Sequence, residues 1–181
     1  MRTEDRQLFK AVSILLRFPD QDLIDALPSM RAALEDRSPI APGGRYHGFI
    51  DYLGTHPLVQ LQEEYSRIFD LSPETCLNMT YHRCGDGRER GLALAGLIGL
   101  YRNSGYEILG SELPDYLPLI LEFLSICDEE ASLKIIKEWA DQVEKLAQHL
   151  KENESPYVAL LETLCELFTV SEHPGRRVGH G

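Results

Sequence analysis

Four carboxylates lie close together in the middle of the chain, and two such groups at a fixed separation could serve as a general acid and a general base. They are Glu107, Glu112, Asp115 and Glu122. No pattern in the sequence holds any two of them at a working separation. Positions at helix ends and on the surface account for these acids, so the sequence favours structural and binding roles over catalysis.

A second candidate centre consists of Cys76, His82 and Cys84. Thiolate and imidazole are good zinc ligands. A fourth ligand is missing nearby, however, and the Cys-x7-Cys and His-x-Cys spacings match no closed structural zinc site. We therefore expect loop thiols and a hydrogen-bonded histidine here, with no metal and no stably bound cofactor.

The glycine-rich stretch at 85–91 resembles a phosphate loop only superficially. Its third glycine, Gly91, comes one residue late for G-x-G-x-x-G, no strand precedes it, and no Gly-Lys-Ser/Thr follows. A helix N-terminus carrying Arg88 and Arg90 could still hold an anion, which leaves a small nucleotide-binding protein as an alternative. No serine occupies a nucleophile elbow and no supported Cys–His pair is visible, so we predict that the chain is not an enzyme.

Composition sets the class of protein. The chain has 181 residues, 43% hydrophobic and 26% charged, which suits one soluble domain. Its net charge of −11 disfavours nucleic acid and suits a basic peptide as partner. No apolar run approaches the roughly 20 residues that cross a bilayer. The N-terminus does not resemble a signal peptide, and four scattered cysteines without Cys-x-x-Cys indicate a reducing cytoplasm.

Apolar residues recur at helical spacing along most of the chain, and strand alternation appears nowhere. We predict an all-α fold, a single-domain helical bundle over 1–171, followed by a disordered tail at 172–181. The stretch 38–44 is expected to be a loop, and 71–87 is the least regular part. Helices are expected at about 8–16, 20–27, 28–36, 46–53, 58–69, 94–103, 117–127, 136–150 and 157–168.

The turn at 111–118 is the most informative segment. Asp115 is placed to cap the following helix, and Pro118 falls in the first helical turn, where a missing N–H costs little. The helix itself is apolar on nearly every face, which is typical of the buried centre of an all-helical domain. A rigid polar turn beside an apolar helix favours recognition of a partner.

Three segments together resemble the NarJ family of nitrate reductase assembly chaperones, within the broader TorD/DmsD group of molybdoenzyme chaperones. They read Tyr-Ser-x-x-Phe-Asp at 65–70, His-x-x-Gly-x-x-Arg-x-Arg-Gly at 82–91, and Glu-Leu-Pro-Asp-x-Leu-Pro at 112–118. Their order and spacing are specific, whereas the flanking helices agree only in kind.

The resemblance implies a helical, cytoplasmic, non-catalytic protein that is a monomer or a homodimer. Such chaperones bind the N-terminal segment of an apo molybdoenzyme catalytic subunit. They keep that subunit competent for insertion of molybdopterin guanine dinucleotide, and they delay its membrane attachment or export. Nitrate reductase is the expected client. A selenate, chlorate, dimethyl sulfide or ethylbenzene oxidoreductase is the alternative.

The resemblance also suggests a site for the partner peptide. In the wider group a Pro-Asp-His turn belongs to the leader-peptide site. Here Tyr116 replaces the histidine, so a role that depends on imidazole titration does not carry over. We expect a helix-lined groove with an acidic edge and an aromatic floor. The expected site residues are Tyr65, Phe69, Tyr81, His82, Arg88, Glu112, Pro114, Asp115, Tyr116, Pro118 and Glu122.

Each assignment has a structural alternative that the sequence leaves open. Tyr65 and Phe69 could belong to the core instead of the groove floor. Arg88 and Arg90 could form an internal ion-pair network that holds the irregular segment. The acids would mainly set the rate and salt sensitivity of association, whereas aromatic contacts would carry most of the affinity.

Overall fold

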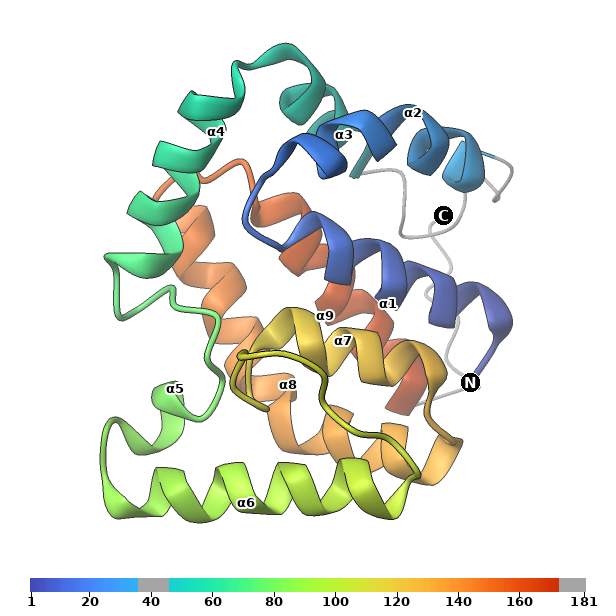
Figure 1. The fold of residues 1–181 in the computed structure, drawn as a ribbon, viewed down its shortest axis with the longest axis vertical. Helices are drawn as coiled ribbons and strands as arrows, with labels where there is room; N and C mark the ends of the chain where they lie inside the picture. Colours follow the sequence, from blue (N-terminus) through green and yellow to red (C-terminus); the bar gives the residue numbers. More distant parts are fainter. Residues whose placement is uncertain (36–45, 173–181) are drawn as a thin grey trace, which may run out of the picture.

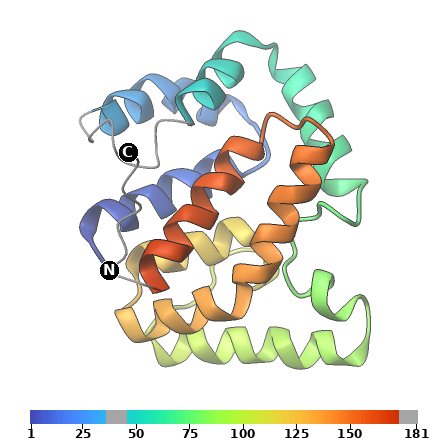
Figure 2. The same ribbon diagram turned by 180° about the vertical axis from the view of Figure 1, so that it is seen from behind.

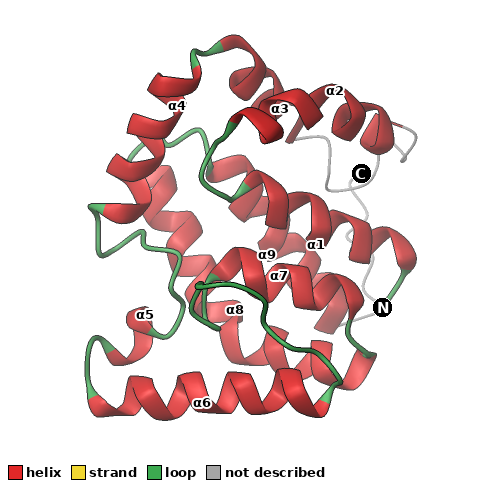
Figure 3. Cartoon of the chain, viewed as in Figure 1, coloured by secondary structure: helices red, strands yellow, loops and turns green. Residues whose placement is uncertain are grey.

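The computed structural model describes residues 1–35 and 46–172, in which every regular element is a helix and no strand occurs beyond one isolated bridge (Figures 1 and 3). This confirms the predicted all-α class. The predicted loop at 38–44 and most of the predicted tail lie outside the described residues. No helix in the described part is both long and apolar enough to cross a membrane.

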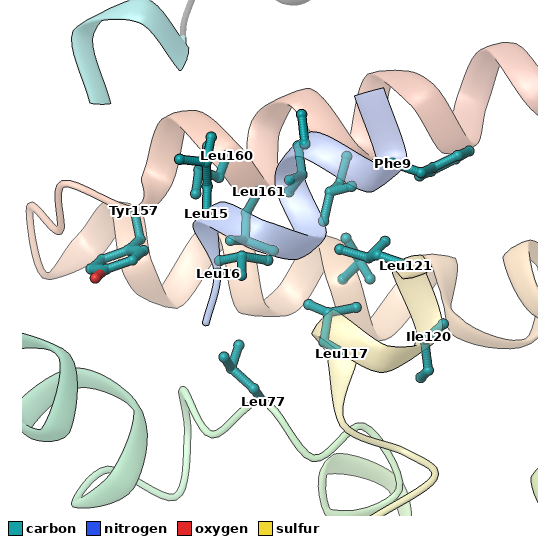
Figure 4. Packing of buried hydrophobic residues seen from close by; sticks show 14 of the residues in the cluster. Phe9, Leu15, Leu16, Leu77, Leu117, Ile120, Leu121, Tyr157, Leu160 and Leu161 are labelled. Atoms are coloured by element: carbon teal, nitrogen blue, oxygen red, sulfur yellow. The ribbon is translucent and has the colours of Figure 1, made fainter. Parts of the chain in front are cut away.

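The centre of the molecule is a stack of four helices. α1 (Thr3–Leu15) packs along α7 (Leu117–Ile126), and α8 (Glu129–Glu152) packs along α9 (Val158–Glu172) (Figures 1 and 2). Helix α1 presents a stripe at i, i+4 and i+7, so its apolar face turns inward as its periodicity predicts. Figure 4 shows the core that results, and its labelled members are Phe9, Leu15, Leu16, Leu77, Leu117, Ile120, Leu121, Tyr157, Leu160 and Leu161.

Helix α7 is the buried element that its sequence predicted. Leu117, Ile120, Leu121 and Leu124 have no exposed surface. Full burial of each such side chain contributes about 1.5–3 kcal/mol. Pro118 occupies the first turn, where its missing N–H leaves no helical hydrogen bond unmade, as expected.

Helix α2 corrects one prediction. Two helices were expected with a break at Pro28, but α2 (Gln21–Glu35) is continuous through that proline. The buried residues Leu23, Leu27 and Leu34 lie on one face, while Pro28 points to solvent. Burial of that stripe outweighs the helical hydrogen bond that proline cannot donate. The start of α2 was predicted correctly, since Asp20 Oδ1 accepts a hydrogen bond from Leu23 N–H at 2.8 Å and so caps the helix.

The chain then passes through α3 (Tyr46–Thr55) and α4 (Leu58–Tyr65) into a π-helical turn, Ser66–Asp70. π-helical turns are rare and frequently occur at functional sites. The next stretch is irregular as expected, apart from the short α5 (Tyr81–Cys84), which was not predicted. Helix α6 (Arg88–Asn103) ends where Gly105 takes a φ of +80°, the C-terminal signal expected from Asn103-Ser104-Gly105.

Candidate functional site

Two motif segments that are far apart in sequence meet through their backbones. Met79 N–H donates to the carbonyl of Asp115 at 3.0 Å, and Leu117 N–H donates to the carbonyl of Leu77 at 2.8 Å. These bonds flank an antiparallel bridge between Asn78 and Tyr116. The irregular segment and the proline-rich turn therefore act as one unit at the start of α7.

Asp115 lies at the centre of this unit and has no exposed surface. Its carboxylate accepts hydrogen bonds from Thr80 N–H at 3.1 Å, from Thr80 Oγ1 at 2.5 Å and from Asn78 Nδ2 at 3.1 Å. A buried carboxylate needs such partners. Asp115 therefore joins the turn before α7 to the segment at 78–80. We call this set of hydrogen bonds the latch.

Two expectations about Asp115 were wrong. It does not cap α7, because the N-cap residue is Tyr116, which makes no side-chain cap bond. It also does not edge an open groove, because its carboxylate is sealed from solvent and cannot meet a partner's cation at the surface. The physical reason is the same in both cases: donors on the 78–80 segment hold the side chain turned inward.

Arg90 completes the latch from α6. Its Nε donates to Thr80 Oγ1 at 3.2 Å, one terminal nitrogen donates to Asp86 at 2.9 Å, and the other lies 3.9 Å from Asp115 Oδ2. The internal network suggested as an alternative is thus formed by Arg90. Arg88 takes no part in these contacts and lies exposed in the first turn of α6. Engagement of Arg90 removes one of the two arginines on which an anion site would depend.

The glycines before α6 serve the turn. Gly85 takes a φ of +54°, a region that favours glycine. A Cβ on Gly87 would lie 3.2 Å from the carbonyl oxygen of Cys84, a close approach that also favours glycine. This agrees with a tight turn between α5 and α6.

Tyr65 and Phe69 belong to the core, at 3% and 4% exposure. Their role as a groove floor is therefore corrected to packing. The Tyr65 hydroxyl donates to the carbonyl of Leu16 at 3.1 Å and lies 2.9 Å from the Tyr116 hydroxyl. Because a carbonyl can only accept, Tyr116 donates to Tyr65. Burial is the largest cause that raises the pKa of both phenols, so both stay protonated.

Tyr116 itself is only half-buried, and large apolar side chains accompany it at the surface. Phe18 is 46% exposed with its ring edge-on to Tyr65 at 5.4 Å, and Leu113 is 43% exposed one turn before Tyr116. Besides burial, the charges of the exposed acids Glu112 and Asp70 raise the pKa of Tyr116, and the charge of Arg17 lowers it. We call Phe18, Leu113, Tyr116, Glu112 and Asp70 the Tyr116 surface.

Sequence reasoning missed Phe18, Leu113 and Asp70. Phe18 was treated only as a helix terminator, and Leu113 only as part of a turn. A usable signal existed, because both are large apolar residues beside prolines and outside any helical stripe. Asp70 ends the Tyr-Ser-x-x-Phe-Asp motif at 65–70, and that position was the signal for it.

Other predicted site residues are held by internal contacts. Glu122 accepts from Lys10 Nζ at 2.5 Å and from Arg17 at 2.7 Å, and the hydrogen bond from Lys10 is the largest cause that lowers its pKa. Pro114 and Pro118 are buried, and their carbonyls accept from the hydroxyls of Tyr101 and Ser13 at 2.8 and 2.7 Å.

The α5 residues Tyr81 and His82 are half-buried. His82 Nε2 lies 2.7 Å from the carbonyl oxygen of Cys76, so the prediction of a hydrogen-bonded histidine is confirmed. Among the described residues no three histidine, cysteine, aspartate or glutamate side chains cluster as metal ligands would.

Two hollows occur away from the Tyr116 surface. One, of about 560 Å³, runs between α8 and α9, and the other, of about 280 Å³, lies beside the end of α6 and residues 106–108. Neither is lined by any of the predicted site residues. The sequence predicted a groove with Asp115 at its edge. Asp115 is buried instead and lines neither of these hollows.

Comparison with known proteins agrees with this architecture. A proposed redox enzyme maturation protein from Archaeoglobus fulgidus superposes with a TM-score of 0.66 over 91% of this chain and 93% of that one, at 19% sequence identity. The probable nitrate reductase molybdenum cofactor assembly chaperone NarJ of Bacillus subtilis is 34% identical over 165 residues, 91% of this chain and 90% of that protein. The nitrate reductase molybdenum cofactor assembly chaperone NarJ of Escherichia coli is 32% identical over 159 residues, 86% of this chain and 67% of that protein.

The helical stack therefore shares its fold with the maturation protein from Archaeoglobus fulgidus. Residues 38–163 match the family described as nitrate reductase delta subunit. The chain belongs to that family, which confirms the resemblance found in the sequence. Both curated relatives are named as assembly chaperones, in line with the prediction that this chain is not an enzyme.

Proposed function

We propose that this protein is a cytoplasmic assembly chaperone for the molybdenum-containing catalytic subunit of nitrate reductase. It binds the N-terminal segment of the apo subunit and assists insertion of molybdopterin guanine dinucleotide before membrane attachment or export. The names of the two NarJ relatives support the client class. The structural observation that carries the proposal is the Tyr116 surface, where apolar side chains are exposed beside acids.

The chemistry of that surface suits a basic, amphipathic leader segment. Such a segment could lay apolar side chains on Phe18, Leu113 and Tyr116, while its positive charges face Glu112 and Asp70. The apolar contacts would supply most of the affinity, and the exposed acids would raise the association rate at low salt. Exposed large apolar residues grouped in this way typically mark an interaction site.

The remaining predicted residues take two roles in this proposal. Tyr81, His82 and Arg88 stay in the proposed contact set, because they are half-buried or exposed on the turn that adjoins the latch. The other predicted residues position the surface from below or beside it. This supporting set comprises Tyr65, Phe69, Pro114, Asp115, Pro118 and Glu122.

Calorimetric titration with the N-terminal peptide of the catalytic subunit tests the proposal. We expect micromolar binding at low salt, and a weakening of about 1–3 kcal/mol for Tyr116→Ala or Leu113→Ala, on the scale of a lost interface anchor. Leu92→Ala is the matched control, because Leu92 is 72% exposed on α6 outside this surface. An equal loss in all three variants, or no binding by the wild-type chain, would contradict the proposal.

A further inference from the structure

Helix α6 packs against the rest of the molecule through only one of its faces. Leu97 and Tyr101 are its buried residues, and the Tyr101 hydroxyl donates to the carbonyl of Pro114 at 2.8 Å. Figures 1 and 2 show α6 along one edge of the molecule, with α7 and α8 on its inner side and no other part of the described chain beyond it. The outer face of α6 is therefore open to a partner.

The outer face carries apolar and very small residues at helical spacing. Leu92 is 72% exposed, Ala95 and Gly96 are exposed one turn later, and Gly99 follows after another turn. We call these four residues the α6 face. Glycine inside a helix destabilises it relative to alanine. No contact in the described chain requires glycine here, because a Cβ on Gly96 or Gly99 would meet no heavy atom within 4 Å apart from the helix's own backbone. Close approach of a second helix would account for both glycines, since small side chains shorten the distance between packed helices.

A hollow of about 280 Å³ lies beside the C-terminal end of α6, and we call it the α6 hollow. Tyr106 is fixed in its wall, because its hydroxyl donates to the carbonyl of Ile126 at 3.1 Å and its ring packs edge-on to Phe123. The α6 hollow is smaller than the roughly 300–1,000 Å³ of small-molecule sites, but it has room for one large apolar side chain. Its lining comprises Ile98, Tyr101, Arg102, Tyr106, Glu107 and Ile108.

Leu92 and the α6 hollow complement each other but cannot meet within one chain. Leu92 lies about 9 Å along the helix axis from Ile98, the first residue of the hollow. In an antiparallel pair of α6 helices centred between Ala95 and Gly96, Leu92 of each copy lies opposite Gly99 of the other copy, next to Ile98. One two-fold axis therefore brings both exposed leucines to both hollows at once, as an interface between identical surfaces requires.

The charges at the two ends of α6 fit the same arrangement. Glu89 is exposed in the first turn, and Arg102 is exposed in the last. Within the described part of the chain neither side chain has an ion-pair partner. An antiparallel pair brings Glu89 of each copy to the end where Arg102 of the other copy lies. A parallel pair would bring like charges together, so these two residues favour the antiparallel direction.

We propose that this protein forms a two-fold dimer through α6, with the two α6 faces packed antiparallel and Leu92 of each copy inserted in the α6 hollow of the other. The helix has 16 residues and is about 24 Å long, so the contact is small for a specific interface. We expect a dissociation constant on the order of 10–100 μM. The dimer goes beyond the proposed function and shares no residue with the Tyr116 surface.

Sedimentation velocity of the full chain over a range from about 5 to about 500 μM tests the dimer, because a reversible dimer forms by mass action. Leu92→Ala should weaken the dimer roughly 100-fold, since the two-fold axis removes both leucines together. Val59→Ala is the matched control, because Val59 is 64% exposed on α4, and it should dimerise as wild type does. Urea unfolding of Leu92→Ala should match wild type, since the side chain is exposed.

Gly96→Leu separates folding from association. The new side chain enters open space in the single chain, and leucine favours helix over glycine, so resistance to urea should hold or rise. At the centre of the dimer the same side chain would hold the two helices apart. We expect association to weaken at least about tenfold. A variant that dimerises as wild type does would overturn the close approach of the two helices and with it the proposal.

Reversal of charge tests the direction of the pair. Glu89→Arg and Arg102→Glu each place like charges at both ends of the antiparallel dimer and should weaken it roughly tenfold. The variant with both reversals restores opposite charges and should dimerise as wild type does. A double variant as weak as the single ones would overturn the antiparallel arrangement.

Two further results would overturn the dimer itself. One is a wild-type chain that stays monomeric up to about 500 μM, in which case a second copy is not the partner of α6. The other is a dimer that Leu92→Ala does not weaken. Neither result bears on the proposed function, because no client peptide is present in these measurements.

Discussion

The Asp115 carboxylate and Thr80 are joined twice, since Oδ2 accepts from both the backbone N–H at 3.1 Å and the hydroxyl at 2.5 Å. This pair links the irregular segment to the turn that begins α7. It explains how a polar residue in the middle of a motif can be important without touching the partner. The motif holds Tyr116 and Leu113 at the surface by anchoring its acid inside.

Asp115→Ala should therefore reduce stability first and peptide binding second. The change leaves the N–H and hydroxyl of Thr80 buried without an acceptor, which costs about 1–3 kcal/mol. Urea unfolding measures this, and Glu63→Ala is the control, because Glu63 is exposed on α4 away from the latch and the variant should stay within about 0.5 kcal/mol of wild type. Unchanged stability with lost binding would show that Asp115 contacts the peptide after all.

The hydroxyl pair of Tyr65 and Tyr116 should behave as one coupled unit. Tyr65→Phe, Tyr116→Phe and the double variant form a thermodynamic cycle, for which we expect a coupling of about 0.5–1.5 kcal/mol. Tyr116→Phe should retain peptide affinity, because the ring that contacts the partner is kept. A strong loss of affinity in Tyr116→Phe would assign the hydroxyl to the partner instead of to Tyr65.

Glu122 should give the stability of the protein a dependence on acid pH. The hydrogen bond from Lys10 and the charge of Arg17 lower its folded pKa below the ordinary value of 4.5. The contribution is thus complete above about pH 4.5 and is lost as the pH falls through the lower folded pKa. Urea unfolding of wild type and Glu122→Gln should show a stability difference near pH 7 that shrinks in acid. A difference that does not change with pH would exclude this ion-pair cluster as its source.

Pro28→Ala should stabilise the protein. The proline is exposed in the middle of α2 and cannot donate to the carbonyl four residues earlier, whereas alanine can. We expect a gain of about 1–3 kcal/mol in the free energy of unfolding. Ser29→Ala, next to it on the exposed side, should change stability by only about 0.5 kcal/mol. A loss of stability in Pro28→Ala would show that the helix depends on the proline.

The features that were predicted correctly from the sequence depend on interactions between residues close together along the chain. Helical periodicity, the Asp20 cap, the helix end at Gly105 and the first-turn position of Pro118 each depend on a few neighbouring residues. They were predicted correctly for that reason. The buried character of α7 followed similarly, because a helix apolar on all faces has to be covered.

What failed were predictions that depended on the partners of a side chain. A proline in a helical pattern predicts a break, but burial of the leucine stripe of α2 keeps that helix whole. An acid before a helix predicts a cap, but donors from residues 78–80 turned Asp115 inward. The exposure of Phe18 and Leu113 also depends on which segments cover their neighbours.

The sequence by itself determined most of the helices, the all-α class and the family, because local periodicity and motif spacing are properties of the chain alone. Only the tertiary structure decided that Asp115 is a latch, that Tyr65 and Phe69 are core, and that Phe18 and Leu113 stay exposed. Burial and hydrogen-bond partners come from segments distant in sequence. The packing of those distant segments therefore determines which of its possible roles a residue takes.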